Sequence, residues 1–129
     1  MCIRDRNRIA VLTAYEAIDA LQADRAAALS SADPYGVSSY LSAIETAAFK
    51  PLSFTAPIVP GKFGPFFEIR TYEVAPKGLA ETEAAWAKVV EQRNAISPLL
   101  MVMGSVDTLP TKMVPVSYTH LTLPTICSV

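Results

Sequence analysis

The sequence predicts an α+β protein in which one open sheet carries its helices on one face. Two observations lead to this prediction. Short apolar strands alternate with longer segments of helical periodicity along a chain of 129 residues, as expected when helices pack on a single sheet. The composition is 51% hydrophobic, which is ordinary for a globular domain, and no apolar run approaches the roughly 18 residues of a membrane span. We therefore expect no membrane span.

The first half of the chain predicts two strands and two helices. Residues 9–15 are apolar on both alternating faces, which is typical of a central strand covered on both sides. Residues 18–29 carry apolar side chains near the helical period in an alanine-rich segment and predict a helix. A second helix is predicted over residues 33–48, because Asp33-Pro34 resembles a helix start and an i, i+3, i+4, i+7 stripe follows. Residues 49–54 predict a short strand, and Pro51 marks it as an edge.

The second half begins with residues 55–65, a proline- and glycine-rich stretch that predicts a linker. The elements expected after it are a strand at 66–74, a helix at 79–96 stopped by Ser97-Pro98, a buried strand at 99–103, a turn at 107–111 and a strand beginning at Met113-Val114.

The amino-acid sequences of the two ends of the chain are compatible with DNA in which one end is the reverse complement of the other. Residues 1–6 can be encoded by ATG TGT ATA AGA GAC AGx, and the reverse complement of that string encodes Val116 to His120 after an xCT codon for Pro115. The string resembles the mosaic end of a transposon-based sequencing library. We therefore expect residues 1–6 and 115–129 to be adapter-encoded. On this hypothesis the strand that begins at Met113 is interrupted after Val114.

This division limits the chemistry that can be expected. The histidine, His120, and both cysteines, Cys2 and Cys127, lie in the expected adapter segments. The residues between them offer no disulfide framework and no thiolate or imidazole ligand, so we expect no metal site and no cofactor. The chain has 11 basic and 12 acidic side chains, a near-neutral balance that gives no electrostatic footprint for nucleic acid.

One segment resembles a known family. Phe66-Phe67-Glu68-Ile69-Arg70-Thr71-Tyr72, followed by Pro76 and Gly78, resembles the opening strand of a NIPSNAP domain, although Lys77 separates the proline from the glycine. Trp86 and Ser97-Pro98-Leu99-Leu100 continue the resemblance. Upstream, Ala14-Tyr15-Glu16 and Asp33-Pro34-Tyr35 resemble the end of a preceding domain of the same kind.

The resemblance implies a ferredoxin-like βαββαβ unit of the dimeric α/β-barrel type, with a four-stranded antiparallel sheet. Residues 7–55 would be the C-terminal half of one domain, 56–65 a linker, and 66–114 the N-terminal half of the next. The chain is thus expected to be a truncated fragment. Joined in this order, the halves predict a circularly permuted sheet, in which strands 9–15 and 66–74 form a parallel central pair and both helical regions cover one face.

The candidate ligand-binding residues lie on two predicted strands. Glu68, Arg70 and Tyr72 alternate along residues 66–74, so their side chains share one face. In ferredoxin-like barrels that face is the one away from the helices. Arg70 could clamp an anion, or Glu68 and Arg70 could form a pair that only stabilises the sheet. Tyr15 could join this patch or simply end its own strand. We assign no catalytic residue.

Two functions are compatible with these features. The first is an assembly or interaction domain that packs sheet to sheet, as a homo-oligomer or as a tandem pair of domains. The second is a small-molecule binder, or an enzyme similar to the cofactor-independent monooxygenases found among dimeric α/β barrels, with the ligand unknown. Fold analogy alone does not separate them. We expect a cytoplasmic protein with no nucleic-acid partner and no membrane span.

Overall fold

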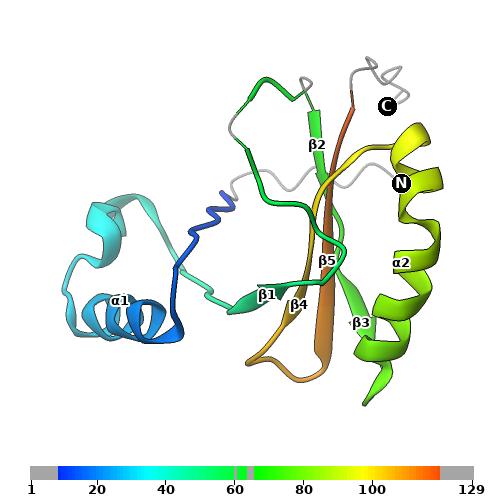
Figure 1. Cartoon of the computed structure of the whole chain (residues 1–129). Coiled ribbons are helices and arrows are strands. Elements are labelled where there is room, and N and C mark those ends of the chain that lie inside the picture. Colours follow the sequence, from blue (N-terminus) through cyan, green and yellow to red (C-terminus); the bar gives the residue numbers. More distant parts are fainter. Residues whose placement is uncertain (1–8, 60, 64–65, 120–129) are drawn as a thin grey trace, which may run out of the picture. The chain divides into compact units, whose positions relative to one another are not determined.

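The computed structural model describes residues 9–59, 61–63 and 66–119 (Figure 1). The chain divides into two compact units, one ending at Glu45 and the other beginning at Thr46. Every residue that is buried, among those described, belongs to the second unit. The packed core is therefore a property of the second unit.

The first unit contains one α-helix, α1 (Ile18–Ser30), which confirms the first predicted helix. The second predicted helix, over residues 33–48, is wrong. Two single turns of 3-10 helix stand in its place, η1 (Pro34–Gly36) and η2 (Ser38–Tyr40). Apolar side chains at helical spacing are therefore not sufficient to form a helix in this segment.

Two local features explain why this helix does not form. Tyr35 and Gly36 have φ angles of +57° and +69°, in the left-handed region that a right-handed helix cannot use. The carboxylate of Asp33 accepts a 2.9 Å hydrogen bond from the backbone N–H of Ser38, and a second from the Ser38 hydroxyl. Such local side-chain bonds compete with helical ones and hold the segment in a turn.

The predicted central strand at residues 9–15 is also wrong. These residues form neither helix nor strand, and Ile9 and Val11 are 83% and 82% exposed. A strand requires a neighbour to pair its backbone N–H and C=O groups. The neighbour predicted for residues 9–15 was the strand at 66–74, which pairs with a different segment.

The second unit is an open antiparallel sheet with one helix packed on it, which confirms the predicted α+β class (Figure 1). The strands run in the order β1-β4-β5-β2, and β3 also pairs with β5. The arrangement is consistent with a ferredoxin-like α+β fold. Its elements are β1 (Phe49–Pro51), β2 (Phe66–Ile69), β3 (Tyr72–Val74), α2 (Gly78–Ile96), β4 (Leu99–Ser105) and β5 (Thr111–Thr119).

β2 and β3 together fill the strand predicted at 66–74. Both pair with β5 in one constant register, with Glu68 opposite Ser117 and Tyr72 opposite Met113. Between them the N–H of Arg70 donates to the carbonyl of Pro115 at 3.2 Å, but proline has no N–H to return. The missing bond explains why one predicted strand appears as two. The sheet therefore has five strands but is four strands wide.

β5 continues through the residues at which an interruption was expected. It includes Pro115 to Thr119, and its residues Pro115, Val116 and Ser117 are buried. Val116 and Tyr118 have high strand propensity and alternate in step with Val114. The prediction that the strand breaks after Val114 is wrong, because the following residues carry the pattern of a strand.

The sheet is not permuted. β5 lies between β4 and β2 in the sheet. Every pair of neighbouring strands is antiparallel. The predicted parallel pairing of residues 9–15 with 66–74 is therefore wrong. β4 and β5 are joined by a short hairpin, so their pairing costs little chain entropy, and β5 then offers its second edge to β2.

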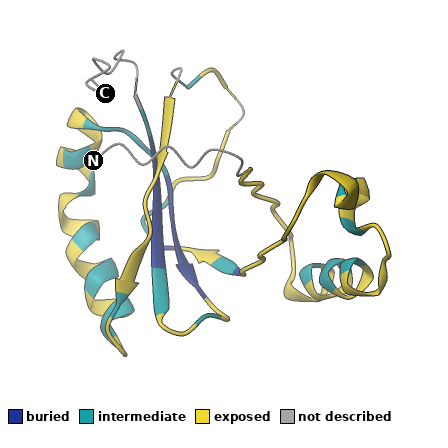
Figure 2. Cartoon of the chain, turned by 180° about the vertical axis from the view of Figure 1, so that it is seen from behind, coloured by how far each residue is buried: buried dark blue, intermediate teal, exposed yellow. Residues whose placement is uncertain are grey.

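The core has one buried cluster on each face of the sheet, and most of its buried residues lie in β4 and β5 (Figure 2). On the α2 side, Val102 and Met113 pack with Leu52, and Leu79 and Trp86 of α2 cover them. A Cβ at Gly104 would lie 2.8 Å from Cδ2 of Leu79, so the missing side chain lets α2 approach the sheet. The other face buries Met101, Met103, Val114 and Val116.

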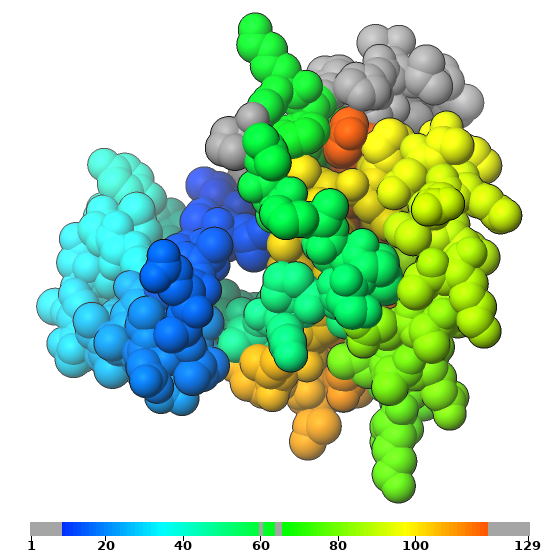
Figure 3. Space-filling view, in the orientation of Figure 1, coloured from blue at the N-terminus to red at the C-terminus, as the bar shows by residue number. Residues whose placement is uncertain are grey.

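β1 lies at the end of the strand order, which confirms the edge predicted from Pro51. Beyond β1, the N–H of Leu52 donates to the carbonyl of Val102 at 2.9 Å. The hydroxyl of Thr55 donates to the same carbonyl at 2.9 Å and accepts from the N–H of Val102 at 3.2 Å. In Figure 3 this segment, turquoise to green, lies in front of the gold strand β4 and beside α2.

Candidate functional site

The structure brings together three of the four predicted site residues. Glu68, Arg70 and Tyr72 lie along one face of the β2–β3 edge. Nη2 of Arg70 is 2.8 Å from Oε1 of Glu68, and the two side chains are 51% and 54% exposed. The pKa of Arg70 is raised, first by hydrogen bonding to Tyr72 and then by Glu68. An exposed pair of this kind contributes little to stability, about 0 to 1 kcal/mol.

The face that carries these residues is the α2 side of the sheet. Tyr72 lies opposite Met113, whose side chain belongs to the cluster covered by α2. The rings of Tyr72 and Trp86 are 6.5 Å apart and tilted by 58°. The expectation that Glu68, Arg70 and Tyr72 face away from the helices is therefore wrong. Alternation along the strand correctly predicts that the three side chains share a face. It does not determine which face of the sheet that is.

Arg93 extends this row and was missed from the sequence. Its guanidinium carbon lies 5.4 Å from the centroid of the Trp86 ring. Nη1 donates to the carbonyl of Ser97 at 2.8 Å, and Nη2 to the hydroxyl of Ser117 at 3.3 Å. Trp86 and Arg93 are seven residues apart, two turns of one helix face, and this spacing was the available signal.

Ser117 connects Arg93 to the predicted residues. It lies directly opposite Glu68 in the β2–β5 register, so the two side chains share a face. The site is thus a row of two guanidinium groups, one carboxylate and two aromatic rings between the sheet edge and α2. It can bind a flat anion or an aromatic acid by charge and ring contacts.

Tyr15, the fourth predicted residue, belongs to the first unit. Its hydroxyl donates a 2.6 Å hydrogen bond to Oδ2 of Asp24, nine residues along the chain. That bond raises the pKa of Tyr15, and the negative charge of Asp24 adds to the effect. Tyr15 therefore has a structural partner within its own unit.

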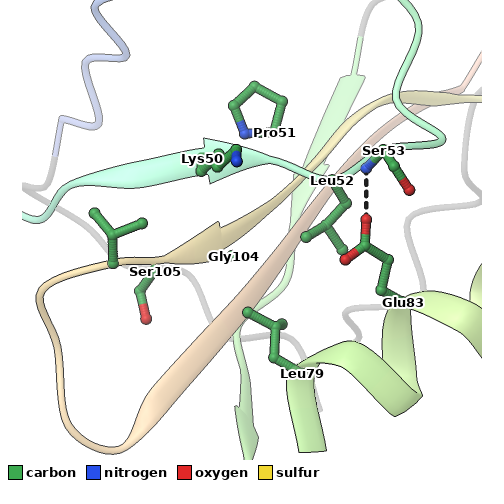
Figure 4. A pocket seen from close by; sticks show the side chains of 9 residues that line it. Lys50, Pro51, Leu52, Ser53, Leu79, Glu83, Gly104 and Ser105 are labelled. Atoms are coloured by element: carbon green, nitrogen blue, oxygen red, sulfur yellow. Dashed lines mark hydrogen bonds between the residues drawn. The ribbon is translucent and has the colours of Figure 1, made fainter. Parts of the chain in front are cut away.

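A depression that the sequence did not predict lies where β1, β4 and α2 meet (Figure 4). Its volume is about 240 Å³, and Leu52, Leu79 and Gly104 line it together with Lys50 and Glu83. The N–H of Ser53 donates to Oε1 of Glu83 at 2.6 Å. Hydrogen bonding to Ser53 lowers the pKa of Glu83, and the charge of Lys50 adds to this. The lining is mainly apolar, with a single held carboxylate.

No group of three or more His, Cys, Asp or Glu side chains in the described part of the chain is arranged to hold a metal ion. Within the same residues, no helix is long and apolar enough to cross a membrane. Comparison with models of protein families, with curated proteins and with solved structures finds no match. The fold and the site together define an α+β sheet domain with a polar–aromatic row along one edge.

Proposed function

We propose that this chain is a NIPSNAP-like assembly domain, whose sheet packs its face away from α2 against a second sheet. One observation carries the proposal. Phe67 and Ile69 of β2 lie opposite Tyr118 and Val116, on the face away from α2, and remain 53% and 57% exposed. They extend the buried cluster of that face toward the edge of the sheet.

The energetic argument follows from this exposure. Burying the exposed half of a Phe or Ile side chain contributes about 1 kcal/mol, so a partner that covers both gains about 2 kcal/mol from them. Contiguous exposed apolar side chains beside a buried cluster are typical of an interaction surface. β2 is exposed along its whole length in Figure 2.

A matched pair of substitutions tests this function. Phe66 and Phe67 are neighbours with 50% and 53% exposure, but alternation puts Phe66 on the α2 side. Sedimentation velocity across a wide concentration range is expected to show self-association of the wild type. Phe67→Lys is expected to weaken it at least about tenfold, and Phe66→Lys to weaken it far less. Equal effects of the two substitutions would remove the basis for sheet-to-sheet packing.

Binding of a small molecule is the second candidate, favoured by the row of Arg70, Tyr72, Trp86 and Arg93. Trp86 is the one tryptophan of the chain, so its emission reports on this site alone. Titration with aromatic carboxylates is expected to change the emission of the wild type, and Arg70→Met to remove the change. An unchanged spectrum across such a series would leave only assembly.

A further inference from the structure

The outer edge of β2 and β3 carries a pattern of charges that is complementary to itself. Glu68 precedes Ile69 and Arg70 follows it, and both charged side chains lie on the α2 side. β2 stands last in the strand order, so this edge is the one turned away from β5. When a second copy of the edge runs antiparallel with Ile69 opposite Ile69, each Glu68 faces the Arg70 of the other copy.

The backbone supports the same alignment. The N–H of Arg70 points toward β5, where it donates to Pro115. Because the N–H and C=O of one strand residue share a side and alternate along the strand, those of Phe67, Ile69 and Thr71 point away from β5. Centring on Ile69 sets Ile69 against Ile69 and Phe67 against Thr71. All of these residues present their outward backbone groups to one another.

Neighbouring alignments are excluded by the same two properties. A shift of one residue sets outward backbone groups against inward ones, and the ladder cannot form. A shift of two residues in one direction opposes Arg70 to Arg70, and in the other direction Glu68 to Glu68. Like charges directly opposite each other are destabilising. Among these neighbouring registers, only the one centred on Ile69 matches the outward backbone groups and opposes Glu68 to Arg70.

We propose that a second copy of this chain adds to the outer edge of β2 and β3, antiparallel, with Ile69 on the twofold axis. The charged side chains then form a quartet in which Glu68 and Arg70 alternate, and Phe66 faces Tyr72. The contact is isologous, so it closes as a dimer. It goes beyond the sheet-to-sheet packing proposed above, because it uses the edge of the sheet and not its face.

A charge-swap series tests the register in the full chain. Glu68→Arg and Arg70→Glu each oppose like charges twice, and each is expected to raise the dimer dissociation constant at least about tenfold in analytical ultracentrifugation. The double variant E68R/R70E restores opposite charges and is expected to return within about threefold of the wild type. Glu81→Arg, on α2, is the matched control for net charge.

Two results would overturn the proposal: a wild type that stays monomeric at every concentration, or a double variant that dimerises no better than the single ones. The same series separates the two proposals. Sheet-to-sheet packing contacts Phe67 and not Glu68, whereas the edge dimer depends on Glu68 and tolerates Phe67→Lys opposite Thr71. Self-association that is weakened only by Phe67→Lys identifies sheet-to-sheet packing. Self-association that is weakened only by Glu68→Arg identifies the edge dimer.

Cysteine crosslinking gives a second readout that does not depend on affinity. With Cys2 and Cys127 changed to Ser, Ile69→Cys is expected to form a disulfide dimer on mild oxidation. The paired Cα atoms would lie about 5.5 Å apart, within reach of a disulfide. Phe67→Cys would lie about 14 Å from its own copy and is expected not to crosslink with itself. Crosslinking at Phe67→Cys with none at Ile69→Cys would refute the register.

Discussion

The backbone N–H of Ser53 donates a 2.6 Å hydrogen bond to Oε1 of Glu83, which joins the residues after β1 to the first half of α2. The bond closes one side of the depression lined by Leu52 and Leu79 (Figure 4). Since the two residues are 30 positions apart, it reports on the packing of α2 against the sheet edge.

This bond makes stability depend on pH. Hydrogen bonding to Ser53 lowers the pKa of folded Glu83 from its ordinary value of 4.5. A lowered carboxyl pKa contributes stability above the unfolded value, and the contribution is lost as the pH falls through the folded value. Glu83→Gln is therefore expected to be less stable than the wild type at pH 7, and the difference to shrink below the unfolded pKa. Urea unfolding at several pH values measures it.

Glu91→Gln removes the same charge from the exposed surface of the same helix and controls for net charge. A Glu83→Gln deficit that stays constant between neutral and acidic pH would contradict the role given to the carboxylate.

Gly104 is expected to be intolerant of a side chain. A Cβ there would meet Cδ2 of Leu79 at 2.8 Å and Cδ2 of Leu52 at 3.3 Å. Gly104→Val is expected to destabilise the protein by about 1 to 3 kcal/mol, through overpacking. Combining it with Leu79→Ala makes room, so the double variant is expected to be more stable than the sum of the single effects predicts. Chemical denaturation supplies the four free energies.

Gly61→Val is the control, because its Cβ would have only ordinary contacts, the nearest at 3.5 Å from Phe63. A Gly104→Val protein as stable as the Gly61→Val protein would mean that α2 is not closely packed there.

Lys77 is expected to be a site where glycine stabilises. It precedes α2 with φ +65° and ψ −3°, a left-handed conformation that costs a side-chain-bearing residue about 1 kcal/mol. Lys77→Gly removes this cost and is expected to raise the free energy of unfolding by up to about that amount. Lys88→Gly, in the middle of the helix, is expected to lower it by about 1 kcal/mol. Two variants that change stability in the same direction would contradict the assignment.

Pro115 is expected to limit the pairing of β5. Pro115→Val supplies an N–H for the carbonyl of Arg70, a bond worth about 0.5 to 1.5 kcal/mol. The gain is partly offset because the unfolded chain loses the restriction imposed by proline, about 0.4 to 1 kcal/mol. Pro57 lies outside any strand, so Pro57→Val only removes the restriction that proline imposes on the unfolded chain. The free energy of unfolding of Pro115→Val is therefore expected to be about 1 kcal/mol higher than that of Pro57→Val. If the N–H introduced by Pro115→Val exchanged as fast as those of loops, the new bond would be refuted.

The sequence predicted the elements that are specified locally. The helix before Ser97-Pro98 was predicted because its stop signal and its apolar spacing agree, and α2 ends at Ile96. The strand at 99–103 was predicted from a short apolar run and is β4, two residues longer. In each case neighbouring residues contain the information.

The errors lie where distant residues or backbone angles decide. Residues 9–15 and 113–119 both carry strand patterns, and the short hairpin that pairs 113–119 with β4 favours this segment as the partner of β2. The stripe after Asp33 predicted a helix, but positive φ angles at Tyr35 and Gly36 prevent it. Arg93 was missed because its partner Ser117 comes from another element.

The register of β2 has a consequence for the tail of β5. All four residues of β2 pair with Val116 to Thr119 of β5. If the polypeptide ended at Val114, Phe66 to Ile69 would have no strand with which to pair. The alternating Val116, Ser117 and Tyr118 have the binary pattern of a strand, so the last part of β5 is what gives the sheet its fourth strand position at β2.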